Sequence, residues 1–197
     1  FYQPKFVLCD VETLSTLPDA ERIAGLAEVV KSAWLDGEAS VAQLEEDAEA
    51  FMRGDADATI RAVRMSVKLK SRIVHEDELE SGRRMLLNLG HTVGHGLEAA
   101  GNYRDIRHGE GVALGMIAAM RVAQALGRGR AEETERLTRL LERLGLPTDL
   151  DKRLNTRALD FIGSDKKRRG DSIHFVIPRL PGDTEIELVS LERVRAA

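Results

Sequence analysis

LLNLGHTVGHGLE, residues 86–98, is the stretch of this sequence that indicates most about its fold and its function. It holds no proline and is rich in leucine, so its pattern predicts one continuous helix. Polar side chains recur through it and just before it at steps of four and three residues, which would place them on one helix face. They are Arg84, Asn88, His91, His95 and Glu98. A solvent-facing stripe is typically made of Lys and Glu, so we expect this face to line a polar cavity.

Gly90 and Gly94 flank this polar stripe. Each costs about 1 kcal/mol of helix stability relative to alanine, so we expect another group to approach the backbone closely there. The His91–His95 pair also has the spacing with which two histidines on one helix bind a metal ion. The alternative interpretation is a surface stripe that carries two incidental histidines.

The composition excludes several classes of protein. The chain has 197 residues, of which 43% are hydrophobic, and this is enough for one substantial core. A formal net charge of −4 gives a nucleic-acid partner no electrostatic support, and no apolar run approaches the roughly 20 residues of a membrane span. The single cysteine, Cys9, rules out an internal disulfide and favours a reducing compartment such as the cytoplasm.

Periodicity predicts a mainly α fold, a multi-helix domain with a small β-hairpin near the C-terminus. The expected helices cover residues 18–35, 40–52, 58–76, 110–126, 131–144 and 156–162, and the expected hairpin strands cover 172–177 and 184–189. Residues 6–9 form a short apolar run that predicts a further strand. The opening FYQPKFVLCD reads like the middle of a protein, so we expect a fragment of a longer chain.

Three residues that are far apart in the sequence have the chemistry of a catalytic metal site. They are Glu28, either His91 or His95, and His108. Two histidines and a carboxylate with an open position form a catalytic zinc arrangement, and the wide spacing is unlike that of a structural zinc finger. Lys31 follows Glu28 by three residues, and an ordinary surface ion pair is the alternative explanation for these two.

Several cations accompany these candidate ligands, namely Lys31, Lys70, Arg84, Lys166 and Lys167. So many cations suggest an anionic, oxygen-rich substrate such as a phosphorylated carboxylic acid. Lys70 falls within the expected apolar stripe of helix 58–76, so it either reaches the surface along its aliphatic stem or is held for the substrate. That stripe comprises Ile60, Val63, Val67 and Val74. His95 and Glu80 remain as candidate proton carriers.

Several ordered motifs together resemble the 3-dehydroquinate synthase family. They are TLSTLP (13–18), GLAEVVK (25–31), ELESGRRMLLNLGHTVGH (78–95), RHGE (107–110) and SDKK (164–167). The resemblance covers essentially the whole chain, as the C-terminal domain of that family. It implies that residues 1–12 are the last piece of an N-terminal nucleotide-binding domain and that residues 13–197 form a helical metal- and substrate-binding domain.

The resemblance also implies roles for individual residues. The implied metal ligands, which also contact the substrate, are Glu28, His91 and His108. The further implied substrate contacts are Lys31, Lys70, Arg84, Asn88 and Lys166, the last in preference to Lys167. The implied catalytic residues are Lys31 and the proton acceptors Glu80 and His95. The implied contacts to NAD are Thr13, Leu14, Ser15, Thr16 and Ala24.

The implied activity is conversion of the seven-carbon phosphate DAHP to 3-dehydroquinate and phosphate, in the shikimate pathway of aromatic amino acid biosynthesis. The resemblance implies NAD and one divalent metal ion, zinc or cobalt, as cofactors, and a homodimer of the full-length enzyme. These residues contain no strand–GxGxxG–helix dinucleotide loop. The alternatives are another sugar phosphate cyclase, a metal-dependent polyol dehydrogenase, and a non-catalytic helical metal-binding domain.

Overall fold

The computed structural model describes residues 4–163, 168–169 and 171–197. Its helical elements are the 3₁₀ helix η1 (Val11–Thr16), α1 (Asp19–Asp36), α2 (Glu38–Met52), α3 (Ala56–Glu76), the 3₁₀ helix η2 (Arg83–Asn88), α4 (His91–Ala100), α5 (His108–Ala125), α6 (Ala131–Arg143), α7 (Leu150–Arg153), α8 (Thr156–Gly163) and α9 (Leu191–Ala196). Its strands are β1 (Arg168–Arg169), β2 (Ser172–Leu180) and β3 (Asp183–Ser190). The predicted mainly α class with a small hairpin near the C-terminus is confirmed.

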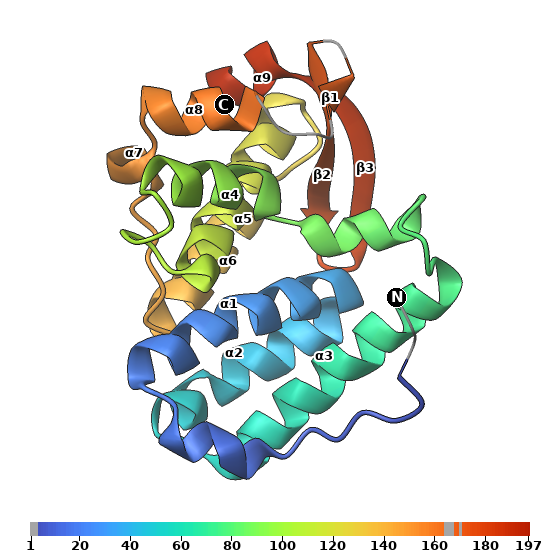
Figure 1. The fold of residues 1–197 in the computed structure, drawn as a ribbon, viewed down its shortest axis with the longest axis vertical. Coiled ribbons are helices and arrows are strands. Elements are labelled where there is room, and N and C mark those ends of the chain that lie inside the picture. The colour runs from blue at the N-terminus through green and yellow to red at the C-terminus, as the bar shows by residue number, and fades with distance from the viewer. Residues whose placement is uncertain (1–3, 164–167, 170) are drawn as a thin grey trace.

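Helix α5 is the buried centre of the molecule. It is rich in Ala, Met and Leu, and most of its residues from Gly109 to Ala123 are buried. Helices α1, α4 and α6 and strand β2 all pack against it. In Figure 1, α1, α2 and α3 are grouped at one end of the molecule, while α4, α8 and the hairpin lie toward the other. Because α5 contacts members of both groups, residues of α1 and α4 can meet at its first turn.

The stretch 86–98 is not the single helix that its pattern predicts. Helix η2 ends at Asn88, Leu89 and Gly90 form a turn, and Gly90 has φ +80° in the left-handed region before α4 begins at His91. Glycine adopts this conformation without the steric penalty that a side chain brings. The prediction that five polar residues share one helix face is therefore wrong, because Arg84 and Asn88 belong to η2 while His91, His95 and Glu98 belong to α4.

Helix α5 approaches the backbone closely at the glycines of this stretch, as we expect from the sequence. A Cβ on Gly94 would lie 2.8 Å from the carbonyl oxygen of Gly111, and a Cβ on Gly115 would lie 1.8 Å from that of Gly90. No real Cβ tolerates such distances, so α4 and α5 pack backbone to backbone only because these positions are glycine. What approaches the glycines is a neighbouring helix.

The hairpin near the C-terminus is present and slightly larger than predicted. Strands β2 and β3 pair antiparallel, with Ile173 opposite Val189, and β1 adds a short third strand on the other side of β2. The alternation of β2 buries Ile173 and Phe175 against the helical core. The predicted strand at residues 6–9 is wrong, because these residues are exposed and are not paired with a strand among the described residues. Within the same described ranges, no helix is long and apolar enough to cross a membrane.

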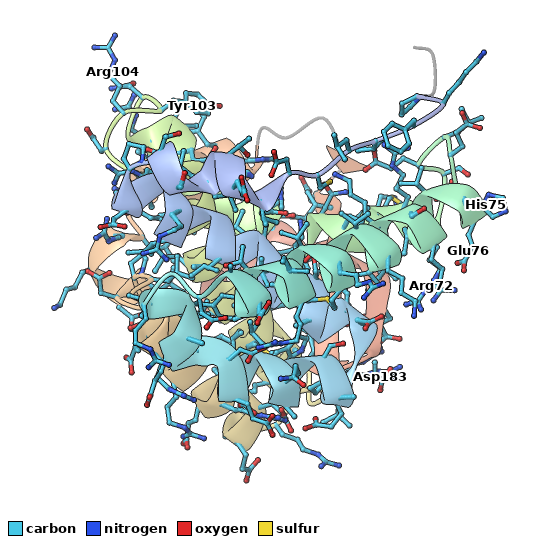
Figure 2. All side chains as sticks on the ribbon, turned by 90° about the horizontal axis from the view of Figure 1, so that it is seen from below. Arg72, His75, Glu76, Tyr103, Arg104 and Asp183 are labelled. Carbon is cyan, nitrogen blue, oxygen red and sulfur yellow. The ribbon has the colours of Figure 1, made fainter. Side chains whose placement is uncertain are left out.

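Helix α3 has the predicted extent but a different buried face. The residues that it buries are Ala58, Ala62, Leu69 and Ile73. Ile60 and Val67, which the sequence pattern assigns to the core, are each 45% exposed. Lys70 is itself exposed, so the prediction that it sits in an apolar stripe is wrong. The charged end of this helix, with Arg72, His75 and Glu76, projects outward (Figure 2).

Candidate metal centre

Glu28, His91 and His108 converge from three helices. Glu28 lies in α1, and the two histidines are the first residues of α4 and α5. The Oε1 atom of Glu28 is 3.5 Å from Nε2 of His91 and 3.7 Å from Nε2 of His108. Close packing of α5 on α1 makes this possible, because a Cβ on Gly109 would lie 1.8 Å from the Ala24 carbonyl oxygen. The three predicted ligands are thus brought together.

Each histidine is oriented through its other ring nitrogen. Nδ1 of His91 lies 3.2 Å from the carbonyl oxygen of Leu89, and Nδ1 of His108 lies 2.8 Å from Oε1 of Glu98. A carbonyl oxygen and a carboxylate both accept, so a neutral imidazole donates from Nδ1. Both rings then direct the Nε2 lone pair toward Glu28. Metal-ligating histidines are typically held in this way.

The donor set fits a divalent cation. Oε2 of Glu28 accepts a hydrogen bond from Nζ of Lys31 at 2.6 Å, whereas Oε1 is buried without a hydrogen-bond donor. A buried anionic oxygen without a partner is unfavourable, and a cation between Oε1 and the two nitrogen lone pairs would satisfy it. One ligand atom from each of Glu28, His91 and His108 lies within 4.8 Å of the others. Two nitrogens and one oxygen leave a coordination position open, as in catalytic zinc sites.

Burial and local charge set the protonation states here. Burial, reinforced by the Lys31 ammonium, lowers the pKa of His91 to about 4, so the ring is neutral at pH 7 and its lone pair is available. Burial raises the pKa of Glu28, but the Lys31 ammonium and its hydrogen bond outweigh burial and lower it. Burial also lowers the pKa of Lys31, against the opposing effect of Glu28, and the positive charge of Lys70 lowers it further.

His95 lies beside this centre. Its ring centroid is 5.3 Å from that of His91 and 5.9 Å from that of His108, and its side chain is exposed. His95, Glu98 and His108 also have ligand atoms within 4.8 Å of one another. His95 therefore borders the open side of the centre, where a proton carrier for a bound molecule would stand. Its predicted catalytic role stays a prediction.

The segment between α3 and η2 positions the other polar candidates. Nδ2 of Asn88 donates to Glu80 at 2.8 Å, which brings two of the predicted residues together. Glu80 has φ +56°. This backbone conformation is unfavourable for any residue except glycine, and it often occurs at functional sites. The Arg84 guanidinium donates to the carbonyl oxygen of Glu78 at 2.5 Å. Lys166, the predicted phosphate-side contact, and Lys167 lie outside the described residues.

Asp77 holds this segment in place. The backbone N–H groups of Arg84, Ser81 and Gly82 donate to its carboxylate at 2.9, 3.0 and 2.8 Å. Together they lower the pKa of the carboxyl to about 2, the bond from Arg84 having the largest effect.

We expect the segment to lose its order only in strong acid. The folded pKa of Asp77 lies below the unfolded value of about 3.9, so its stabilisation is fully present above that value and is lost as the pH falls through about 2. Amide proton shifts of Ser81, Gly82 and Arg84, followed from pH 5 to about pH 1, should inflect near pH 2. An inflection near pH 4 would contradict the bonding described. Asp77→Asn should remove the titration altogether.

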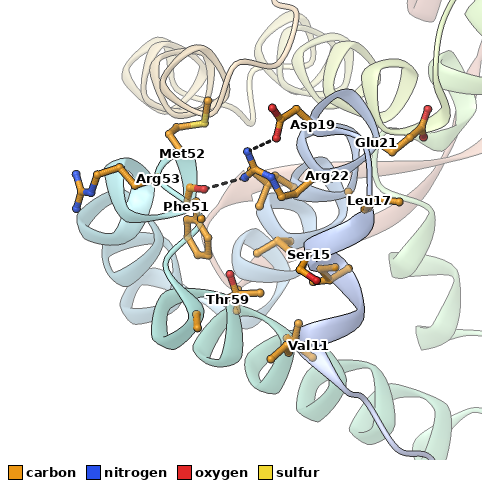
Figure 3. Close-up of a pocket in the computed structure, with 18 of the residues that line it drawn as sticks. Val11, Ser15, Leu17, Asp19, Glu21, Arg22, Phe51, Met52, Arg53 and Thr59 are labelled. Carbon is orange, nitrogen blue, oxygen red and sulfur yellow. Dashed lines mark hydrogen bonds and ion pairs between the residues drawn. The ribbon is translucent and has the colours of Figure 1, made fainter.

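The predicted NAD contacts lie apart from the histidines. A cavity of about 810 Å³ is lined by Leu14 and Ser15 of η1 and by Leu26 and Val29 of α1. Figure 3 shows this cavity, with Ser15 labelled. Neither the three candidate metal ligands nor Ala24 lines this cavity. Ala24 is buried, and its carbonyl oxygen faces Gly109. The described residues therefore do not bring Ala24 and residues 13–16 to one cavity, and their role toward NAD stays a prediction.

Glu98 is the residue at this centre to which the sequence assigned no role. Glu98 is only 6% exposed, and its carboxylate contacts the ring of the candidate ligand His108. Its place seven residues after His91 puts it on the same face of α4 as that ligand. This spacing is the signal by which it could be found. The other orienting group is the backbone carbonyl of Leu89, which any residue type could supply, so it cannot be predicted from the sequence.

Comparison with known proteins agrees with the resemblance in the motifs. Two curated proteins named 3-dehydroquinate synthase are similar to this chain. That of Symbiobacterium thermophilum is 43% identical over 188 residues, which cover 94% of this chain and 52% of that protein. That of Pelobacter propionicus is 41% identical over 194 residues, which cover 98% of this chain and 54% of that protein. The chain thus spans about half the length of these curated relatives.

Two solved structures share the fold. One is ValA, a 2-epi-5-epi-valiolone synthase from Streptomyces hygroscopicus subsp. jinggangensis 5008 with NAD+ and Zn2+ bound. Its TM-score is 0.79 and its sequence identity is 24%, and the match covers 95% of this chain and 52% of that chain. The other is 2-deoxy-scyllo-inosose synthase complexed with carbaglucose-6-phosphate, NAD+ and Co2+. Its TM-score is 0.80 and its sequence identity is 20%, and the match covers 100% of this chain and 56% of that chain. At these identities the likeness shows the fold alone.

The family model described as 3-dehydroquinate synthase C-terminal matches residues 25–168, which include every candidate ligand and both of the groups that orient the histidines. The chain therefore belongs to the 3-dehydroquinate synthase C-terminal domain family.

Proposed function

We propose that this chain is the metal- and substrate-binding part of a 3-dehydroquinate synthase, which converts DAHP to 3-dehydroquinate and phosphate. The family and the names of the curated relatives support this proposal. The observation that carries it is the buried, unpartnered Oε1 of Glu28, which faces the Nε2 atoms of two oriented histidines. A divalent ion held there, zinc or cobalt, would act as a Lewis acid on the oxygen of the carbon that is oxidised and reduced again.

Lys31 is held ready for an anion. Its side chain is 6% exposed and is fixed by Glu28, so the ammonium reaches the centre in one orientation. The charge of Lys70 acts on it, and two like charges at short range repel each other. An anionic substrate placed between them would remove that repulsion. This electrostatic arrangement favours a phosphorylated acid over an uncharged polyol.

Glu80, Asn88 and His95 would serve the proton transfers. Glu80 is held by Asn88, which leaves its other carboxylate oxygen able to accept a proton. His95 stands at the open side of the centre, within reach of a molecule bound there. Arg84 and Lys166 complete the proposed substrate contacts. NAD, which we propose contacts Thr13–Thr16 and Ala24, would accept and return the hydride.

Lys70→Met tests the proposed anion contact. Lys70 is exposed, so the substitution should leave the melting temperature unchanged within a few degrees. In the full-length protein, kcat/KM for DAHP should fall roughly 10- to 100-fold, because a hydrogen bond to a charged group contributes about 1.5–3 kcal/mol. Lys68→Met, on the same helix and also exposed, is the matched control and should keep normal activity. Equal rates for both variants would mean that Lys70 is an ordinary surface lysine.

The proposed activity can be tested with the full-length protein and with residues 1–197. The full-length protein should release phosphate from DAHP in the presence of NAD and a divalent metal. The 197-residue chain should bind the metal but should show no NAD binding in the micromolar range and no phosphate release, because its sequence holds no dinucleotide loop. Phosphate release by the full-length protein only from a sugar phosphate without a carboxylate would favour a different cyclase. Metal binding without any turnover would favour a non-catalytic domain.

We also propose the two expected domain segments, residues 1–12 and 13–197, a homodimer for the full-length protein, and a cytoplasmic location. Composition supports the location through the single cysteine. Sedimentation of the full-length protein would test the homodimer.

A further inference from the structure

Glu98 is a buried carboxylate whose partner is a histidine. Glu98 is 6% exposed, and among the described residues it forms no ion pair with any arginine or lysine. Its hydrogen-bond partner is Nδ1 of His108, at 2.8 Å. Asp47, the second buried carboxylate among the residues whose burial is described, is held instead by the Nε and Nη2 atoms of Arg61. A carboxylate is unfavourable in the interior unless it is paired, so the placement of Glu98 calls for an explanation.

The protein makes room for this carboxylate. A Cβ on Gly111 would lie 3.1 Å from Oε1 of Glu98 and 3.4 Å from its Cγ. Gly111 follows His108 by three residues in α5, so the glycine that admits Glu98 is on the same helix face as the ring that Glu98 contacts. The two helices therefore bring the carboxylate and the ring together as part of their packing.

His108 needs such a partner more than His91 does. The side chain of His108 is 51% exposed, whereas that of His91 is 14% exposed and held by its surroundings. An exposed imidazole turns about its side-chain bonds and exchanges its proton between the two ring nitrogens. Only the form with a proton on Nδ1 and the ring turned toward Glu28 offers a lone pair to the centre.

We propose that Glu98 is a positioning residue, which fixes the tautomer and the orientation of His108 and thereby sets the affinity of the centre for a divalent metal. The inference rests on the proposed function only in that it takes the ion to be bound at Glu28, His91 and His108. Outer contacts of this kind typically change metal affinity by about 10- to 100-fold when they are removed.

The first measurement needs no variant. Long-range ¹H–¹⁵N spectra of the metal-free 197-residue chain, at a pH where histidine is neutral, report which nitrogen carries the proton. His108, assigned by comparison with His108→Gln, should be protonated at Nδ1. A proton on Nε2, or an even mixture of the two tautomers, would overturn the proposal, whether or not the chain binds metal.

The second measurement uses Glu98→Gln, with Asp47→Asn as the matched loss of a buried carboxylate. Glutamine keeps the size but can turn its NH₂ toward Nδ1, so it no longer selects one tautomer. The dissociation constant for zinc, measured by chelator competition, should rise about 10- to 100-fold in Glu98→Gln and stay unchanged in Asp47→Asn. The tautomer of His108 should become mixed in Glu98→Gln alone.

Three results would separate the possible failures. A lower melting temperature of metal-free Glu98→Gln, with affinity and tautomer unchanged, would make Glu98 merely structural and overturn the proposal. Two zinc ions bound per wild-type chain, with one lost in Glu98→Gln, would make Glu98 a ligand together with His95 and His108 and would also overturn it. No zinc bound by the wild-type chain would refute the metal centre in the proposed function, while the tautomer would still decide whether Glu98 orients His108.

Discussion

Gly115→Ala is expected to destabilise this protein by at least about 3 kcal/mol, a large share of the roughly 5–15 kcal/mol by which folded domains are usually stable. The new Cβ would lie 1.8 Å from the carbonyl oxygen of Gly90 and 2.7 Å from the carbonyl carbon of the same residue. Backbone atoms cannot turn aside as the end of a flexible side chain can, so α5 would have to move away from α4. Urea unfolding followed by circular dichroism measures the loss.

Gly25→Ala is the matched control for that substitution. Gly25 also lies inside a helix, α1, but a Cβ there meets no atom within 4 Å. The change should stabilise the protein by up to about 1 kcal/mol through helix propensity alone. The two glycine-to-alanine changes are thus expected to have opposite signs. If both shifted the free energy of unfolding by the same small amount, the backbone contact between α4 and α5 would not be as close as described.

His91→Ala is expected to raise the dissociation constant for zinc by more than about 100-fold. This exceeds the roughly 10- to 100-fold loss of affinity that follows when a residue that only contacts a ligand is replaced. The ring is one of two that direct Nε2 toward Oε1 of Glu28, and alanine offers no donor atom in its place. Glu28→Gln and His108→Ala should have effects of similar size. Chelator competition gives the affinity, and metal content after dialysis gives the stoichiometry.

His95→Ala is the control for the ligand variants, since His95 stands beside the centre and is predicted not to be a ligand. It should keep the metal and lose activity in the full-length protein. Loss of metal in His95→Ala together with its retention in His108→Ala would reverse the assignment and place the ion in the group of His95, Glu98 and His108.

The candidate metal centre is predictable from the sequence only in part. Residue type points to Glu28, to His108 and to either His91 or His95 as ligands, and the choice of His91 comes from the resemblance in the motifs. The break at Gly90 is not predictable in this way. Its left-handed backbone makes room for α5, since a Cβ there would lie 2.6 Å from the Val112 carbonyl oxygen. That contact is between residues distant in sequence, and periodicity reports only local order.

The error on α3 has a similar physical origin. The pattern favours large β-branched residues as core, and so selects Ile60 and Val67, which are in fact 45% exposed. The buried face instead begins with Ala58 and Ala62, because α1 and α2 pack close to this part of the helix. Small residues at a close helix contact resemble neutral surface positions in sequence. Spacing in the sequence places Glu98 on the face of α4 that carries His91, but its contact with His108 depends on the packing of α4 on α5.

The three candidate ligands come from α1, α4 and α5, so a metal ion bound by all three would also stabilise the assembly of these helices. An unfolded chain holds these side chains too far apart to chelate one ion, so binding would occur only after the helices have assembled. By mass action, free ion at 100 times its dissociation constant would stabilise the folded state by about 2.7 kcal/mol. A cell short of the metal would therefore lose the protein to proteolysis as well as losing its activity, because the unliganded chain opens more often.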